Sequence, residues 1–124
     1  MFYAILCYDS EAVTTSMSAE EDGALMDRLG AVQDKLARKR KLGPVARLMP
    51  TSAATTLRKG QGTLVVDGPF AETKEQLLGF YLVDCDSREE AIEIARDLAG
   101  AATHGTGTYE FRPLMTFKPT PEAQ

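Results

Sequence analysis

The middle of the chain carries the stretch DGPFAETKEQ at residues 67–76, between apolar runs at 63–66 and 78–83. Short apolar runs with β-branched and aromatic members are typical of strands. Proline restricts its own φ and keeps the residue before it out of the α region, so Gly68 and Pro69 predict a rigid turn. Asp67 is therefore expected at a strand end in a defined position, which makes its carboxylate the first candidate for chemistry.

Patterns on both sides of this stretch predict six strands and two helices. The strands are expected at 2–8, 45–49, 54–58, 63–67, 78–84 and 108–112. A glycine-containing loop joins the third and fourth of them into a hairpin. Capping boxes at 18–21 and 87–90 begin the helices, and Gly43 and Gly100 are expected to end them. Residues 10–17 are expected to form a loop.

This order of elements predicts an α+β, ferredoxin-like split βαβ fold with an antiparallel sheet, both helices on one face and an extra β-hairpin. We expect a single domain over 1–117 and a flexible tail at 118–124, which has nothing to bury.

Alternation in the last two long strands predicts which side chains face the helices. The bulkier set of Leu78, Phe80 and Leu82 is expected to pack under them. That leaves Tyr81, Glu110 and Arg112, with Tyr3, on the helix-free face. A sheet face of this kind is rarely left to water, so we expect a homodimer.

Composition excludes several classes of protein. The net charge is −4, with 14 basic and 18 acidic residues and no basic stripe among aromatics, which argues against nucleic-acid binding. The apolar N-terminal run lacks a basic segment and a cleavage site and is too short to span a bilayer, so no membrane role is expected and the cytoplasm is the expected location. Cys7 and Cys85 lie in apolar segments and are expected to be reduced, half-buried thiols.

Residues 67–81 closely resemble the signature of the YCII-related family, in its DGPF-motif branch. Supporting matches lie at 1–8, 18–21, 54–58 and 109–114. The resemblance implies a dimeric α/β barrel, in which two sheets pack face to face around a pocket, and kinship with muconolactone-isomerase-type enzymes. It also implies an association with an extracytoplasmic-function sigma factor, because members of the DGPF branch are often encoded beside one.

A catalytic histidine–aspartate pair has been suggested for the YciI branch of the family. The only histidine here is His104, and none lies in the first half of the chain. A pair in this protein is therefore expected to join His104 with Asp67. Val45 is a second departure, since many relatives have glycine there, and it is expected to narrow the pocket.

The candidate site residues also have structural interpretations. Asp67 is a candidate acid or base, or an Asx-type cap that accepts N–H groups of the following turn. Arg58 is a candidate for binding an anionic substrate, or an ion-pair partner of Asp67 or Glu72. Glu72 and Lys74 are substrate-binding candidates that could instead pair with each other. His104 titrates near neutrality, although a lone loop histidine is usually exposed.

Two candidates come from the predicted helix-free face. Tyr81 and Arg112 are expected to line the pocket wall, and Arg112 has an alternative partner in Glu110, two residues away on the same strand face.

Two functions fit these residues. The first is a small-molecule enzyme of lyase or isomerase type, with Asp67 moving a proton in a pocket at the sheet face. The second is a non-catalytic ligand-binding or regulatory dimer that accompanies a sigma factor. A third interpretation is a protein with a purely structural or assembly role. No metal or nucleotide cofactor is implied, because the sequence has no phosphate-binding glycine loop and no cluster of metal ligands.

Overall fold

A computed structural model describes residues 1–60, 62–102, 105–118 and 120. The elements in these residues are the strands β1 (Phe2–Asp9), β2 (Leu42–Arg47), β3 (Thr55–Arg58), β4 (Leu64–Asp67), β5 (Gln76–Asp84) and β6 (Thr108–Pro113), the helices α1 (Glu11–Thr14), α2 (Ala19–Arg38) and α3 (Arg88–Ala101), and the 3-10 turn η1 (Thr51–Ala53).

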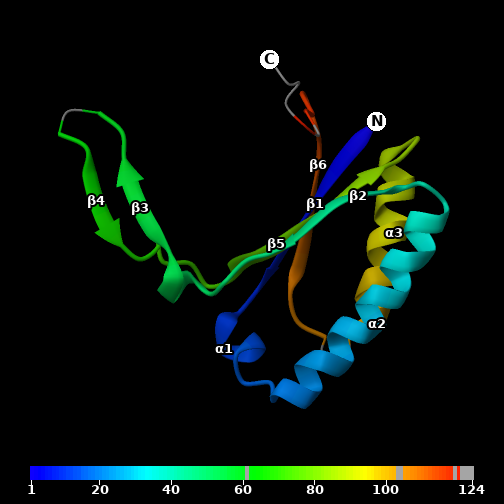
Figure 1. Cartoon of the computed structure of the whole chain (residues 1–124), viewed down its shortest axis with the longest axis horizontal. Coiled ribbons are helices and arrows are strands. Elements are labelled where there is room, and N and C mark those ends of the chain that lie inside the picture. The colour runs from blue at the N-terminus through cyan, green and yellow to red at the C-terminus, as the bar shows by residue number, and fades with distance from the viewer. Residues whose placement is uncertain (61, 103–104, 119, 121–124) are drawn as a thin grey trace.

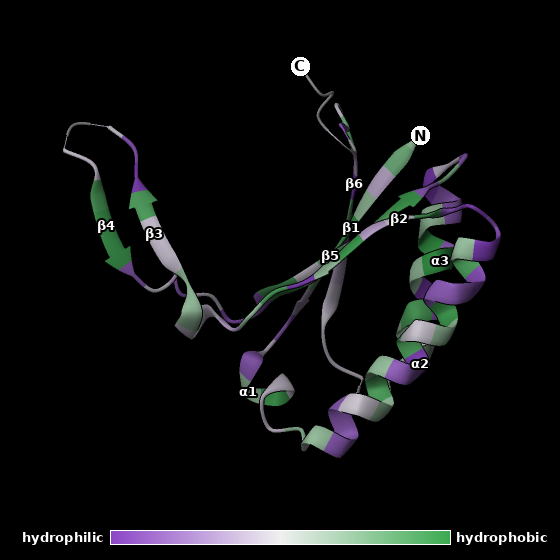
Figure 2. Cartoon of the chain, viewed as in Figure 1, coloured by the Kyte–Doolittle hydropathy of each residue, from purple (hydrophilic) through white to green (hydrophobic). Residues whose placement is uncertain are grey.

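Four strands form an antiparallel sheet in the order β2-β5-β1-β6, and β3 and β4 form a separate hairpin. Helices α2 and α3 lie side by side on one side of the sheet, whereas the hairpin projects on the other side (Figure 1). The fold is therefore α+β with a ferredoxin-like strand order, as the sequence predicts, and β3–β4 is the extra hairpin. Hydrophobic and hydrophilic residues alternate along both helices (Figure 2), and the buried ones include Leu25 and Leu36 of α2 and Ile94 and Leu98 of α3.

The hydrophobic core lies between the sheet and the two long helices. Ile5 and Val83 from the sheet are fully buried against Leu98 of α3, and Cys85 is buried beside them. Both cysteines are free thiols, as predicted, but only Cys7 is half-buried, whereas Cys85 is fully buried.

The two faces of the sheet are assigned differently from the prediction. Tyr81 and Val83 face the helices, and Tyr3 packs against the same core, so placing the two tyrosines on the helix-free face was wrong. Both alternating sets of side chains on β5 are apolar, so alternation does not determine which set faces the helices. Choosing by bulk failed because α2 and α3 bring large side chains of their own to the core, such as Leu36.

The other face of the sheet, which no helix covers, is called the open face below. The strand register places Leu6 opposite Phe80 and Glu110, and Ala4 opposite Leu82 and Arg112. Directly opposed residues share a face. The open face therefore consists of Ala4, Leu6, Ala46, Phe80 and Leu82, with Glu110 and Arg112 at one edge.

The end of α2 also differs from the prediction. The helix ends at Arg38, and Gly43 lies inside β2, where an added Cβ would come within 2.9 Å of the Leu82 carbonyl oxygen. Arg40 takes the left-handed conformation, with φ 58°. The Arg40 N–H donates to the Ala37 carbonyl at 3.0 Å, and the Lys41 N–H donates to the Leu36 carbonyl at 3.0 Å. This is the Schellman pattern, in which glycine normally occupies the left-handed position.

The other helix boundaries need smaller corrections. Residues 10–17 include the one-turn helix α1, and Gly100 lies within the last turn of α3. Ser18 and Glu21 form the predicted capping box. Ser87 caps α3 by accepting from the Glu90 N–H, but the Glu90 carboxylate pairs with Lys41 instead of closing a second box.

Replacing Arg40 with glycine is expected to raise the free energy of unfolding by about 0.5–1 kcal/mol. A left-handed conformation costs a non-glycine residue about 1–2 kcal/mol, and glycine removes this strain. Glycine also gives the unfolded chain more backbone freedom, which stabilises the unfolded state but offsets only part of the gain. Arg40 is exposed, so the side chain itself is not missed. Urea unfolding of Arg40→Gly measures the change, with Arg38→Gly inside the helix as a control that should be destabilised by about 1 kcal/mol. An Arg40→Gly protein less stable than the parent would contradict the cap.

Candidate active site

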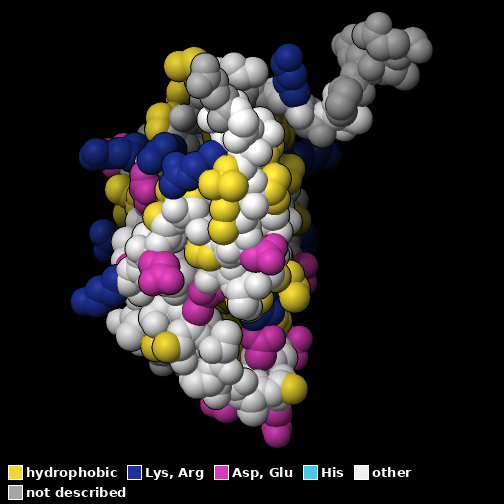
Figure 3. All heavy atoms as spheres, turned by 90° about the vertical axis from the view of Figure 1, so that its left-hand side faces the viewer, with side chains coloured by type: hydrophobic (Ala, Val, Ile, Leu, Met, Phe, Trp, Pro, Cys, Tyr) yellow, Lys and Arg dark blue, Asp and Glu magenta, His cyan; other side chains and the backbone are white. Residues whose placement is uncertain are grey.

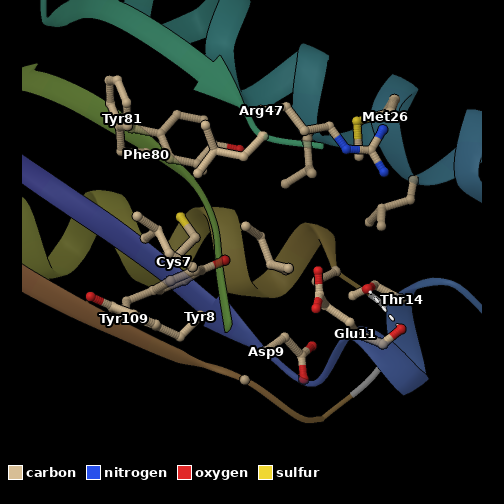
Figure 4. Close-up of a pocket in the computed structure, with 18 of the residues that line it drawn as sticks. Cys7, Tyr8, Asp9, Glu11, Thr14, Met26, Arg47, Phe80, Tyr81 and Tyr109 are labelled. Carbon is tan, nitrogen blue, oxygen red and sulfur yellow. Dashed lines mark hydrogen bonds between the residues drawn. The ribbon is translucent and has the colours of Figure 1, made fainter. Parts of the chain in front are cut away.

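A cavity of about 570 Å³ lies on the helix side of the sheet, between the ends of β1, β2 and β5 and the helices α1 and α2 (Figure 4). This volume falls in the range of sites for small organic ligands. Apolar side chains from α2, such as Leu25, Met26 and Leu29, form one wall. Polar side chains gather near the end of β1, at Asp9, Glu11 and Thr14. We call this space the helix-side cavity.

Asp9 ends β1 and is the one charged residue found buried among the described residues, with 3% of its surface exposed. Its Oδ1 accepts from the Ser10 N–H at 2.7 Å, and its Oδ2 accepts from the Thr106 hydroxyl at 3.2 Å. A carboxylate is costly to bury unless hydrogen bonds replace its water. These bonds therefore fix a carboxylate at the polar end of the cavity.

Glu11 anchors α1 across the polar end of the cavity. Its Oε2 accepts from the Thr51 N–H at 2.6 Å, and its other oxygen accepts from the Thr51 hydroxyl. The Glu11 N–H donates to Oε1 of Gln76 at 2.9 Å. The short helix α1 is thus tied to η1 and to the start of β5, although they are distant in sequence.

Arg47 of β2 forms a two-pronged ion pair with Asp22 of α2. Its two terminal nitrogens donate to the Asp22 carboxylate at 2.6 and 3.1 Å. The pair raises the pKa of Arg47 and lowers the pKa of Asp22, chiefly through these hydrogen bonds. Both side chains line the cavity, but the guanidinium already has a carboxylate partner, so it is not a free site for an anionic ligand.

Three phenols, those of Tyr8, Tyr81 and Tyr109, and the thiol of Cys7 line the cavity. Burial raises the pKa of Cys7 to about 12 and the pKa of Tyr109 to about 12, and it also raises the pKa of Tyr81. All three groups are protonated at neutral pH. The Cys7 thiol is therefore a poor nucleophile, since the thiolate is the reactive form, whereas neutral phenols can donate hydrogen bonds to a ligand oxygen.

The structure places most of the predicted site residues outside this cavity. Asp67 is exposed at the end of β4, opposite Thr55, and among the described residues no hydrogen bond to its side chain is found, so the predicted Asx-type cap is not seen. Arg58 pairs in register with Leu64, at the far end of the hairpin from Asp67.

The remaining predicted residues are also dispersed. Glu72 and Lys74 are exposed and form no ion pair with each other within the described part of the chain; Glu72 borders a smaller hollow with Gly68 and Pro69. The Arg112 Nε donates to Glu110 at 2.7 Å, the strand-face pairing considered above as the alternative. Of the predicted residues, Tyr81 lines the helix-side cavity. It does so from the face of the sheet that packs against the helices, whereas it was expected on the helix-free face. His104 lies outside the described residues.

The sequence reading missed Asp9, Glu11 and Arg47. A signal for Asp9 was present, because it follows an apolar strand and precedes Ser10, the same kind of position that singled out Asp67. No such signal marks Glu11 or Arg47, whose partners lie 40 and 25 positions away along the chain.

The described residues lack two further kinds of feature. No group of three or more histidine, cysteine or acidic side chains in that part of the chain is arranged to hold a metal ion. None of its helices combines the length and the apolar composition needed to cross a bilayer.

Comparison with known proteins places the chain in a family. Residues 1–118 match the YCII-related domain. The chain belongs to the YCII-related family. It is also 60% identical over 120 residues to an uncharacterised protein of Rhizobium meliloti (strain 1021), an alignment that covers 96% of each chain. The family match spans all of the elements that build the helix-side cavity.

Proposed function

We propose that this YCII-related protein binds a small, largely apolar molecule with an oxygen-bearing group in the helix-side cavity and acts on it as a lyase or isomerase. The observation that carries the proposal is the buried Asp9 carboxylate at the polar end of a cavity with apolar walls. Such a combination is the default arrangement of a small-molecule site.

The lining supports proton transfer more than nucleophilic or anion-binding chemistry. Asp9 can take a proton from a carbon next to a carbonyl group and return it to a neighbouring carbon, which needs no further reactant. The neutral phenols of Tyr81 and Tyr109 can donate to the carbonyl oxygen as negative charge develops on it. Cys7 is protonated and Arg47 is already paired, so neither fits a competing role.

A thermal-shift screen tests the binding step. We would screen lactones, cyclic enones and phenols, because each combines an apolar ring with an oxygen acceptor or donor. A ligand at 100 times its dissociation constant adds about 2.7 kcal/mol to the free energy of unfolding. Met26→Trp should abolish the shift by filling the cavity, whereas Met115→Trp, at a fully exposed position, should keep it. Equal shifts in both variants would show that the ligand binds elsewhere.

A non-catalytic role is the second candidate, and the hydrogen bonding of the cavity supports it. Asp9, Glu11 and Arg47 all have partners within the protein, as expected of a closed ligand sensor. This second candidate includes an association with an extracytoplasmic-function sigma factor. That association follows from membership of the DGPF branch, for which residues 67–70 are the support. A ligand that shifts the melting temperature without being turned over, together with co-purification of a sigma factor, would favour it.

The pair formed by His104 and Asp67 is an alternative source of proton transfer. Its support is chemical, because His104 is the only histidine in the chain. If this pair acts, His104→Gln and Asp67→Asn should each abolish turnover of a ligand found in the screen.

We also propose that the protein is a homodimer that pairs through the open face. Leu6, Phe80 and Leu82 are only half-buried there, and none of the helices in the described residues covers them. A second copy placed two-fold to the first would bury the same patch on both sheets.

A further inference from the structure

The β3–β4 hairpin and the turn after it, residues 55–70, form an arm that stands apart from the body. Among the described strands, β3 and β4 pair only with each other. The arm extends on the open-face side of the sheet, away from α2 and α3 (Figure 1). Its root is held by two bonds, from the Gly68 N–H to the Ala54 carbonyl and from the Thr56 hydroxyl to the Gly68 carbonyl.

The arm exposes apolar side chains on both of its faces. Leu57 lies opposite Val65 on one face, and Leu64 and Val66 lie on the other. The Val65 side chain is 62% exposed and Phe70, just after β4, is 79% exposed. The hydropathy colouring shows β4 as one of the most hydrophobic segments of the chain (Figure 2). Natural edge strands avoid such surfaces, and an isolated two-stranded hairpin is at best marginally stable in water.

The cover for this arm has to come from outside the chain. The residues beyond the described part are Gln61, 103–104, 119 and 121–124, and the sequence has no large aliphatic or aromatic hydrophobic side chain at any of them. These positions of the sequence therefore offer no matching apolar surface.

We propose that the arm clasps a second copy of this chain, so that each protomer of the dimer is held by the arm of the other. This inference rests on the homodimer proposed above. Two observations favour a second copy as the occupant. The arm and the open face lie on the same side of the molecule, so one partner docked there can cover both.

The second observation is the distribution of charge on that side. Figure 3 shows basic side chains mostly in the upper part of this side and acidic side chains mostly in its lower half, with apolar side chains between them. A two-fold axis through the apolar middle would set the basic end of one copy against the acidic end of the other. Such self-complementarity is what an isologous interface requires.

The apolar area that the arm and the open face expose is large enough for a dimer interface. Five half-exposed to exposed apolar side chains on the arm offer on the order of 100 Å² each, roughly half of the 800 Å² per partner of a standard interface. The open face can supply the rest. A membrane fits less well, because the sequence between β3 and β4 includes KGQG at 59–62, which offers no apolar side chain to insert.

The test measures self-association in sedimentation equilibrium with the full chain. Val65→Asp should raise the dimer dissociation constant at least 30-fold, because a carboxylate would be buried in the interface. Met115→Asp, an equally drastic change at an exposed site off the arm, should alter it less than about twofold. Circular dichroism and urea unfolding check that Val65→Asp still folds, as its exposure in the single chain predicts.

A cross-link locates the contact directly. A benzophenone side chain at Lys59 is irradiated in a mixture of 14N- and 15N-labelled protein, and cross-links between differently labelled chains are expected. A dimer with no mixed cross-links, and no effect of Val65→Asp, would overturn the clasping arm and leave the open-face dimer standing. A wild-type monomer at tens of micromolar, or binding of monomers to anionic phosphatidylserine vesicles through the arm, would overturn the arm contact as well. The shift in melting temperature that a ligand causes in the Val65→Asp protein tests binding in the helix-side cavity, independently of whether the arm contact and the dimer are found.

Discussion

Gly79→Ala is expected to destabilise the protein by about 3 kcal/mol or more, a large part of the roughly 5–15 kcal/mol that holds a domain of this kind together. A Cβ at Gly79 would lie 2.2 Å from the Ala46 carbonyl oxygen and 3.1 Å from the Arg47 Cα. Both atoms are backbone atoms of β2, so no side chain can rotate away. Relief requires β2 to separate from β5, which would also move Arg47 from Asp22 and disturb a wall of the helix-side cavity.

Gly30→Ala is the matched control. Gly30 lies inside α2, and an added Cβ there would meet nothing within 4 Å. The same substitution should therefore stabilise the protein by about 1 kcal/mol, through the higher helix propensity of alanine. Urea unfolding of both variants gives the comparison. Equal stability of Gly79→Ala and the parent would mean that β2 and β5 are not as closely paired as the structure shows.

Asp9→Asn is expected to lower turnover of any substrate of the helix-side cavity by about 10²–10⁴-fold, because asparagine cannot accept the proton. The fold should survive. The asparagine oxygen can accept from the Ser10 N–H, and its amide can donate to the Thr106 hydroxyl, so the bonds to Ser10 and Thr106 each have a replacement. Asp9→Ala, which leaves the Ser10 N–H without this acceptor, should instead cost about 1–3 kcal/mol of stability.

Asp67→Asn provides the comparison within the same assay. Asp67 is exposed on the hairpin and does not line the cavity, so turnover should stay within about twofold of the parent. Loss of turnover in Asp67→Asn with full activity in Asp9→Asn would reverse the assignment and support the pair with His104. A ligand that binds but is not turned over, in the parent and in both variants, would favour the sensor role.

Local patterns predicted the elements well, because local energies set them. Apolar runs marked the strands, and the hairpin around Gly60 and Gly62 followed from turn chemistry, with both glycines at positive φ. The left-handed position that ends α2 was predicted at Gly43, three residues after its place at Arg40, because glycine before proline is a typical stop signal. Arg40 takes the left-handed position instead, since the neighbouring strand needs Gly43 for close approach to Leu82.

The candidate site was much harder to predict than the elements. Asp67 was predicted as a site residue because its turn is rigid and its motif identifies the family, but neither property determines whether a carboxylate lines a cavity. Asp9 became a candidate only when Thr106, nearly a hundred positions later, was seen to donate to it. Tyr81 lines the helix-side cavity and does not lie on the helix-free face where it was expected, because alternation cannot tell which apolar face of β5 lies inside.

By itself the sequence determined the strands and helices, the ferredoxin-like order and the family, all of which depend on patterns within short segments. Only the tertiary structure decided that the DGPF turn belongs to a projecting arm and that the buried carboxylate at the cavity is that of Asp9. The reason is physical. Burial and hydrogen bonding depend on which distant segments meet. The helices that cover Tyr81 and the segment around Thr106 that donates to Asp9 reach β5 and β1 through contacts that no local pattern records.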